Sequence, residues 1–88
     1  MPNFKTRLKF YADTPSGQRN KLHCYECDLF NIEAMIKRFT IRGYIIRAAY
    51  FETLSDDGKT CISNVRVQGL EDIITSAFYE LKFRKLLS

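Results

Sequence analysis

Long apolar runs are absent from this chain. Nowhere in its 88 residues do about eighteen apolar residues follow one another, which is the length that a transmembrane helix needs. The first residues lead directly into charged ones, without the apolar core of a secretory signal. The count of 3 cysteines is odd, and it is low for a secreted scaffold held by disulfides. These absences favour a protein of the reducing cytoplasm without a membrane-spanning segment.

Histidine is scarce too: His23 is the only one, and it stands beside Cys24 and Cys27 in the stretch HCYEC. A structural zinc site needs four ligands and a C-x-x-C pair folded into a tight knuckle, but no second pair follows and Cys61 stands alone. In an extended strand, Cys24 and Cys27 project to opposite faces. A redox pair needs its first cysteine at a helix N-terminus, and the next predicted helix begins several residues after Cys27. We therefore expect structural cysteines, no metal and no other cofactor, with a zinc site or a redox pair as the alternatives.

Catalytic patterns are equally sparse. The 4 glycines are scattered at turns, so the chain has no glycine-rich loop to cradle phosphate. His23 has no nucleophile or carboxylate partner at a readable spacing. We expect a protein that is not an enzyme. The remaining catalytic hypothesis is a small basic ribonuclease that uses His23 beside Arg19 and Lys21.

Apolar and aromatic residues are present in quantity. Hydrophobic residues make up 45% of the sequence, which contains 7 Phe and 5 Tyr, and this excludes a disordered chain. A length of 88 residues suits a single domain, 1–88, with one modest core. The net charge is +4, and residues 1–25 account for it, because acidic and basic residues balance in 26–88. A concentrated basic segment favours an anionic partner.

Residues 4–12 alternate in character, which predicts a half-buried strand with a basic outer face. The inward set is Phe4, Thr6, Leu8 and Phe10, and the outward set is Lys5, Arg7, Lys9 and Tyr11. Residues 13–20 have the composition of a turn, and residues 21–27 are predicted to form a second strand. The pattern of this strand leaves two registers open, one with Lys21, His23 and Tyr25 on the outer face and one with the alternate set there.

A helix is predicted over 32–42. Its apolar stripe at helical spacing consists of Ile32, Met35, Ile36 and Phe39. We expect Asn31 to cap the N-terminus and Phe30 to pack against Met35. Gly43 is expected just past the C-terminus, where glycine commonly ends a helix.

A hairpin is predicted next, because residues 44–54 are rich in β-formers and Asp57-Gly58 marks a two-residue turn. With that turn, Leu54 pairs with Cys61, Tyr50 with Val65 and Ala48 with Val67. The inner face then holds Ile46, Ala48, Tyr50, Leu54, Cys61, Val65 and Val67. The outer face receives Arg47, Ala49, Phe51, Ile62, Asn64 and Arg66. Glu52 and Ser63 fall on the inner face, in conflict with their polarity.

The last helix is predicted over 70–86, with a core stripe of Leu70, Ile73, Ile74, Ala77, Phe78 and Leu81. The element order is therefore β-β-α-β-β-α, which indicates an α+β fold. Because both helices are apolar on one side, we expect a four-stranded, mainly antiparallel sheet with the two helices packed on one face.

The sheet face opposite the helices is the first candidate functional surface. Positive side chains interleaved with aromatic ones suit single-stranded nucleic acid, which needs phosphate neutralisation and base stacking. The predicted nucleic-acid-binding residues are Lys5, Arg7, Lys9, Tyr11, Arg47, Phe51 and Arg66. The aromatic motif of the commonest sheet binders is absent. The alternatives are a site for an acidic protein surface and a solvated face whose charges protect a strand from aggregation.

The outer side of the last helix is the second candidate surface. Tyr79, Phe83 and Leu86 follow one another at i, i+4 and i+7, roughly opposite the core stripe. An apolar row on the outside of a helix calls for a partner. A homodimer seam, a helix that docks in a groove, and a helix end folded back on the sheet edge would each explain it.

We therefore expect a small cytoplasmic binding module that docks on nucleic acid, or on a protein that handles nucleic acid, through its basic sheet face. The rival hypothesis is a protein-binding regulator or inhibitor, of the compact kind that phages and mobile elements encode, acting through the last helix.

Overall fold

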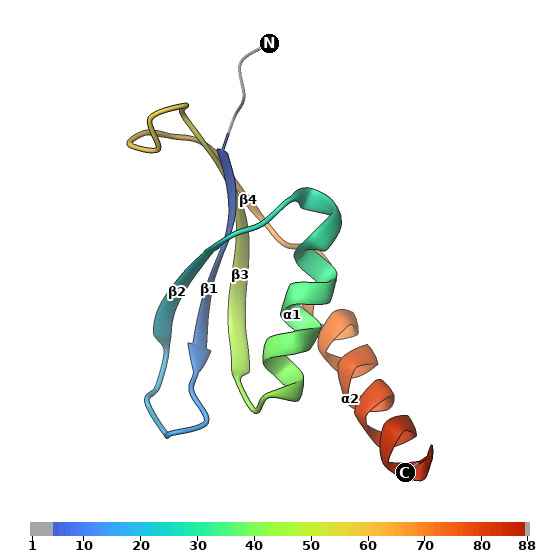
Figure 1. Ribbon diagram of the computed structural model, residues 1–88. Helices are drawn as coiled ribbons and strands as arrows, with labels where there is room; N and C mark the ends of the chain where they lie inside the picture. The colour runs from blue at the N-terminus through green and yellow to red at the C-terminus, as the bar shows by residue number, and fades with distance from the viewer. Residues whose placement is uncertain (1–4, 88) are drawn as a thin grey trace.

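The structure, a computed structural model, describes residues 5–87 (Figure 1). Its elements are β1 (Lys5–Asp13), β2 (Lys21–Glu26), a short 3-10 turn η1 (Leu29–Asn31), α1 (Ile32–Ile41), β3 (Ile45–Leu54), β4 (Cys61–Arg66) and α2 (Leu70–Leu87). The strands form one antiparallel sheet in the order β2-β1-β3-β4. The predicted α+β class, element order and antiparallel sheet are confirmed. Phe4, assigned to the first strand, lies outside the described residues.

The core lies between the sheet and α1. Leu8 and Phe10 of β1 and Ile36 of α1 have no exposed surface, because the alternation of β1 turns one side of the strand toward the helix. Phe39 places its ring 5.0 Å from that of Phe10. Burial of each such side chain contributes roughly 1.5–3 kcal/mol. The sheet therefore stabilises α1, which has 10 residues and is too short to be stable alone.

The C-terminus of α1 and its first residue, Ile32, agree with the prediction, but the contacts predicted at its N-terminus are wrong. Gly43 follows the helix with φ +99°, in the left-handed region that favours glycine. Asn31 makes no side-chain capping hydrogen bond, and Phe30 is 95% exposed instead of packing against Met35. The cause is η1, an extra turn ahead of the helix that carries Phe30 into solvent.

β3 contains an irregularity that the sequence pattern did not predict. Tyr11 pairs with Ala48 and Ala12 pairs with Ile46, so Arg47 has no partner on β1. An extra residue of this kind is a β-bulge, and it reverses the faces of the residues that follow. Ile46 is buried as predicted, but the predicted faces of Ala48, Ala49, Tyr50, Phe51, Glu52 and Leu54 are wrong.

A second irregularity changes the register of β3 and β4 from the predicted one. Leu54 pairs with Cys61 as predicted, but Thr53 pairs with Ser63, so Ile62 is an extra residue. Tyr50 therefore pairs with Arg66 and not with Val65. The two bulges together leave Asn64 and Arg66 on the predicted outer face and place Cys61 there as well.

Both helices lie on the same side of the sheet, and α2 packs mainly along α1 (Figure 1). Its first turns reach the core through Leu70, Ile73 and Ile74, and Ala77 is fully buried. Phe78, which was predicted in the core stripe, is instead 57% exposed. This part of α2 packs against one helix alone, and a single helix covers a narrower stripe than a sheet and a helix together.

Candidate functional site

We call the sheet surface opposite the helices the open face. Directly paired residues of antiparallel strands share a face, so the registers assign its members. These are Leu22, Cys24 and Glu26 of β2, Lys5, Arg7, Lys9 and Tyr11 of β1, Ala48, Tyr50, Glu52 and Leu54 of β3, and Cys61, Asn64 and Arg66 of β4. The predicted outer set of the first strand is confirmed. The sequence left two registers possible for the second strand. The structure decides between them, because Lys21, His23 and Tyr25 lie on the helix side.

Four side chains converge on the carboxylate of Glu52, which is 3% exposed. Arg7 donates from Nε to Oε1 at 2.7 Å, and Asn64 donates from Nδ2 to Oε2 at 3.2 Å. The Cys61 thiol donates to Oε2 at 3.4 Å, and the Lys9 ammonium lies 3.8 Å from the same oxygen. The conflict that placed Glu52 on the inner face is thereby resolved, because its buried charge has partners on the open face.

The charge of Glu52 lowers the net charge of the open face. Burial by itself raises the pKa of Glu52, but hydrogen bonds from Arg7 and Cys61 and the charges of Arg7 and Lys9 outweigh it, so the pKa lies below its ordinary value. The hydrogen bond between Arg7 and Glu52 also raises the pKa of Arg7. Glu52 is therefore ionised at neutral pH, and the open face is less basic than the alternation of β1 alone indicates.

Tyr11 and Tyr50 provide the aromatic surface of the open face. Their ring centroids lie 6.5 Å apart with the planes at 89°, an edge-to-face arrangement. The Lys9 ammonium lies 5.8 Å from the centre of the Tyr50 ring, within the roughly 6 Å reach of a cation–π contact. Arg66 pairs with Tyr50 across β3 and β4 and is exposed. Aromatic and cationic side chains thus lie side by side.

Phe51, one of the predicted binding residues, is not part of this surface. It pairs with Val65 on the helix side and packs against the core, so its predicted place on the open face is wrong. Tyr50 occupies the open face in its stead, and sequence reasoning missed it because of the bulge at Arg47. One signal could have revealed the error: the predicted register buried Glu52 without a partner.

Arg47, another predicted binding residue, is engaged in a local ion pair. It donates from Nε to Oδ1 of Asp13 at 2.9 Å. Hydrogen bonds from Arg47 and from the backbone N–H of Asn20 lower the pKa of Asp13 to about 2. The pair links the end of β1 to the bulge of β3, and the carboxylate of Asp13 largely neutralises the charge of Arg47.

His23 lies in an aromatic cluster on the helix side. Its ring stacks on Phe10 with centroids 4.9 Å apart and meets the edge of Tyr44 at 5.5 Å. Its Nε2 is buried and has no hydrogen-bond partner. Burial, and after it the charge of Lys21, lowers the pKa of His23. The ring is therefore held neutral among apolar neighbours, an environment that favours a packing role over proton transfer.

The three cysteines are free: Cys24 lies in β2, Cys27 directly follows that strand, and Cys61 begins β4. Cys24 is exposed on the open face, whereas Cys27 is buried in the core, so the predicted opposite placement of this pair is confirmed. Burial raises the pKa of both the Cys27 and the Cys61 thiol, which disfavours the reactive thiolate. Within residues 5–87 there is no group of three or more His, Cys, Asp or Glu side chains that could hold a metal ion.

The outer side of α2 is as apolar and as open as predicted. Tyr79, Phe83 and Leu86 are 69%, 62% and 76% exposed, and Phe78 joins them. Because α2 packs along α1, it also leaves the helix side of β4 uncovered. A groove of about 540 Å³ lies there, and its lining includes Leu29, Phe51, Val65 and Ile73.

Comparison of the chain with family models, with curated proteins and with solved structures gave no match. Among the helices of residues 5–87, none combines the length and the apolar character needed to cross a membrane.

Proposed function

We propose that this protein is a small non-enzymatic module that binds single-stranded nucleic acid on its open face. The observation that carries the proposal is the Tyr11–Tyr50 ring pair, with Lys9 against one ring and Arg66 beside it. Every nucleic-acid base can stack on an aromatic ring, whatever the sequence of the strand, and neighbouring cations neutralise the phosphates. The chemistry is binding without a reaction, in a protein that we expect to work in the cytoplasm.

The charge balance of the open face sets the expected strength of binding. Arg7 and Lys9 share their charge with Glu52, and Arg47 is paired with Asp13. Among the described residues, Arg66 takes part in no such ion pair. With so few uncommitted cations, we expect micromolar affinity at low salt that falls steeply as salt is added, because each neutralised phosphate releases counterions.

The test is fluorescence anisotropy of labelled single-stranded DNA and RNA oligonucleotides, repeated across a salt series. Saturable binding that weakens with salt and competes with unlabelled single strands better than with duplexes supports the proposal. Absence of binding even at low salt would remove nucleic acid as the ligand of the open face, and an acidic protein surface would then be the partner to test.

A second candidate function, binding of a protein as a regulator or inhibitor, is favoured by the exposed side chains of α2. The occupant that we propose for this surface is a second copy of the chain. Large aromatic side chains bury roughly 150–250 Å² each, so Phe78, Tyr79 and Phe83 offer a few hundred Å² per copy. The groove beside β4 adds further apolar surface, and an interface smaller than the roughly 800 Å² per partner of a standard one makes a weak dimer.

The test of this second candidate is the mass of the protein in solution. A homodimer has twice the 10.3 kDa of one chain, and its proportion rises with protein concentration. A protein that stays at the mass of one chain at high concentration excludes the second copy as the occupant of α2.

A further inference from the structure

β4 is the outermost strand on one side of the sheet, and no strand of residues 5–87 lies beyond it (Figure 1). All of its residues, Cys61–Arg66, are exposed. Proteins commonly protect an edge strand with several charges, a proline or a covering element. The sequence of β4 contains no proline and one charged residue, Arg66, so its edge is open to pairing with another extended chain.

The backbone groups on this edge follow from the ladder with β3. Val67 donates its N–H to the carbonyl of Ala49 at 2.9 Å. In antiparallel strands, residues that bond to the neighbouring strand alternate with residues that do not. Val65 therefore bonds to β3 as well, whereas the N–H and C=O groups of Asn64 and Arg66 point away from it. This spacing of donors and acceptors matches the backbone of an extended chain.

The apolar groove of about 540 Å³ lies over β3 and β4 on the helix side. Its apolar lining residues are Leu29, Ile32, Phe51, Val65, Val67 and Ile73. Val65 is 56% exposed and belongs both to the groove and to the edge strand. Directly paired residues of neighbouring strands share a face, so a strand added beside β4 places every second side chain at the groove.

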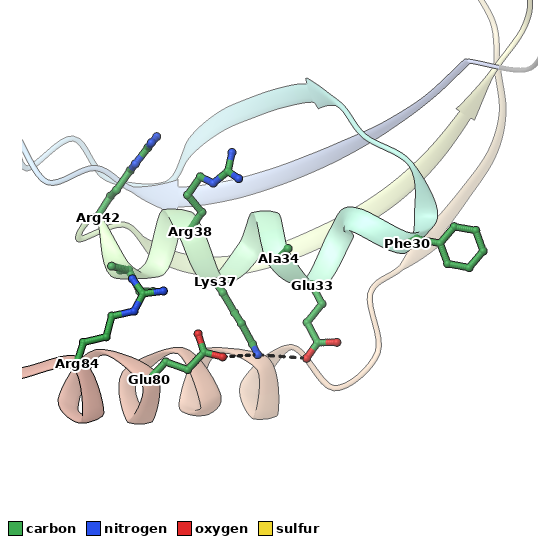
Figure 2. A pocket seen from close by; sticks show the side chains of 9 residues that line it. Phe30, Glu33, Ala34, Lys37, Arg38, Arg42, Glu80 and Arg84 are labelled. Atoms are coloured by element: carbon green, nitrogen blue, oxygen red, sulfur yellow. Dashed lines mark hydrogen bonds and ion pairs between the residues drawn. The ribbon is translucent and has the colours of Figure 1, made fainter. Parts of the chain in front are cut away.

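The charges around the groove have one sign uncommitted. Its acidic residue is Glu33, whose carboxylate is turned toward the ammonium of Lys37, 3.7 Å away (Figure 2). Arg66 takes part in none of the ion pairs of the described residues. Residues 58–68 include Lys59 as a second cation and contain no acidic residue. The edge therefore favours an acidic chain, whereas a second copy of β4 would bring the same cations to the seam.

β2, the strand at the other edge of the sheet, differs in both respects. Its helix-side residues His23 and Tyr25 already stack on the ring of Phe10. It also carries charges of both signs, on Lys21 and Glu26. Only at β4 do an open edge, an apolar groove and an excess of positive charge coincide among the strands of residues 5–87.

We propose that an extended, acidic peptide segment of a partner protein binds beside β4 and adds a strand to the sheet. Its backbone exchanges hydrogen bonds with Asn64 and Arg66. Its apolar side chains, at every second position, cover Val65 and enter the groove, and the acidic side chains between them lie against Arg66. Main-chain hydrogen bonds give such a complex its affinity, and the groove gives its specificity. The proposal requires neither nucleic acid on the open face nor a homodimer.

The probes are labelled, end-capped hexapeptides in which glutamate alternates with valine, leucine or phenylalanine, titrated into the full chain and followed by fluorescence anisotropy. We expect saturable binding of at least one of them, weakened by salt because Arg66 attracts the glutamates. The backbone amides of Asn64 and Arg66 should exchange with solvent more slowly in the complex, since both donate to the peptide. Peptides with lysine in place of glutamate should bind about 10-fold more weakly. Absence of saturable binding by every glutamate peptide up to about 1 mM would overturn the proposal.

Methylated versions of the tightest-binding peptide test the direction of the hydrogen bonds. Residues paired with Asn64 and Arg66 lie on the open face, so the glutamates direct their N–H groups to β4 and the apolar residues direct theirs away. N-methylation of the glutamates should weaken binding about 10-fold or more, because main-chain hydrogen bonds are lost. N-methylation of the apolar residues should change the affinity by less than about 2-fold. Equal effects of the two would exclude strand addition beside β4.

Asn64→Pro removes an outward N–H group from the protein itself. Proline is tolerated in an edge strand where the N–H faces solvent, so the ladder with β3 is kept. The matched control, Asn64→Ala, loses the same side-chain hydrogen bond to Glu52 but keeps the N–H. Peptide binding should weaken about 10-fold in Asn64→Pro and less than about 2-fold in Asn64→Ala, and equal weakening would contradict the proposal. If Asn64→Pro folds poorly, the methylated peptides still decide with the unchanged protein.

A second copy of the chain is the competing occupant of the β4 edge, and the mass in solution distinguishes it. A dimer that Asn64→Pro dissociates and Phe83→Glu leaves intact would assign the edge to a second copy and overturn the proposal. Tyr50→Ala separates the peptide site from the open face, because Tyr50 lies on the opposite side of the sheet from the groove. This variant should keep its peptide affinity within about 2-fold, whether or not the open face binds nucleic acid.

Discussion

Arg7 donates a hydrogen bond of 2.7 Å from Nε to Oε1 of Glu52, its direct partner across β1 and β3. The contact places a buried negative charge in the middle of a surface that the sequence pattern describes as basic. It stabilises the sheet and, by the same charge, weakens the attraction of the open face for anions. These two consequences can be measured separately.

Replacement Glu52→Gln removes the charge and keeps the shape of the side chain. We expect single-stranded oligonucleotides to bind about 2- to 5-fold more tightly at low salt, because the charge of Arg7 becomes available to phosphate. The free energy of unfolding should fall by roughly 1–3 kcal/mol, the usual cost of losing a hydrogen bond to a charged group. Anisotropy and urea denaturation measure the two effects. Glu71→Gln, which changes the net charge equally at the start of α2, is the control; equal tightening in both variants would show that net charge alone governs binding.

Tyr50→Ala tests the ring pair itself. Loss of one stacked base costs roughly 1–3 kcal/mol, so oligonucleotide affinity should fall about 5- to 100-fold with little change in its dependence on salt. The matched control is Phe51→Leu, one residue along the same strand and on the opposite face. It should bind as the unchanged protein does, while its stability falls by less than about 1.5 kcal/mol. If Phe51→Leu loses binding and Tyr50→Ala keeps it, the assignment of the two faces is wrong.

His23 should make the stability of the protein sensitive to mild acid. Its pKa is lower in the folded protein than in the unfolded chain, so the unfolded chain takes up more protons as the pH falls below about 6.5. The stabilising effect is complete above that pH and is lost as the pH falls toward the folded pKa. Urea denaturation at about pH 7.5 and about pH 5 should show a lower free energy of unfolding at the acid pH.

The control for this pH effect is His23→Phe, which keeps an aromatic ring in the cluster with Phe10 and Tyr44 and removes the titrating nitrogen. Its stability should be nearly equal at the two pH values, because the lowered pKa values of Asp13 and Glu52 place their titration in more acidic solution. A variant that loses as much stability as the unchanged protein would show that another group is responsible.

Phe83→Glu places a charge in the middle of the exposed row on α2. If two copies associate through this row, the variant should run at the mass of one chain under conditions where the unchanged protein is dimeric, with an unchanged circular dichroism spectrum. Light scattering after size exclusion gives the mass. Gln18→Glu, which changes the net charge equally in the exposed turn between β1 and β2, should leave the dimer intact. A mass that Phe83→Glu does not alter removes the homodimer through α2.

Several parts of the candidate surfaces could be predicted from local patterns. The alternation of β1 places Lys5, Arg7, Lys9 and Tyr11 on one face in any sheet, because side chains alternate with a period of two. The row of Tyr79, Phe83 and Leu86 follows from helical spacing in the same way. Phe51 and Tyr50 each lie on the face opposite to the predicted one, because one extra residue, Arg47, interrupts the alternation. No local feature of the stretch marks a bulge.

The charge distribution shows the same division between sequence and structure. Counting along the chain locates the basic excess in residues 1–25 and finds balance in 26–88. The structure brings some charges of the second part together: Lys37 of α1 forms ion pairs with Glu33 of the same helix and with Glu80 of α2. Balance along the sequence does not imply balance in space.

The sequence by itself determined the kind and order of the elements, the basic side of β1, the end of α1 just before Gly43 and the apolar row on α2. Each of these depends on neighbours within a few residues, through alternation, helical spacing or a single backbone angle. Only the tertiary structure decided the faces of β3, the partners of Glu52, the packing of α2 along α1 and the ion pair between Lys37 and Glu80 of the two helices. Each of these depends on residues that are far apart in the chain, and their pairing is selected by burial and charge across the whole fold.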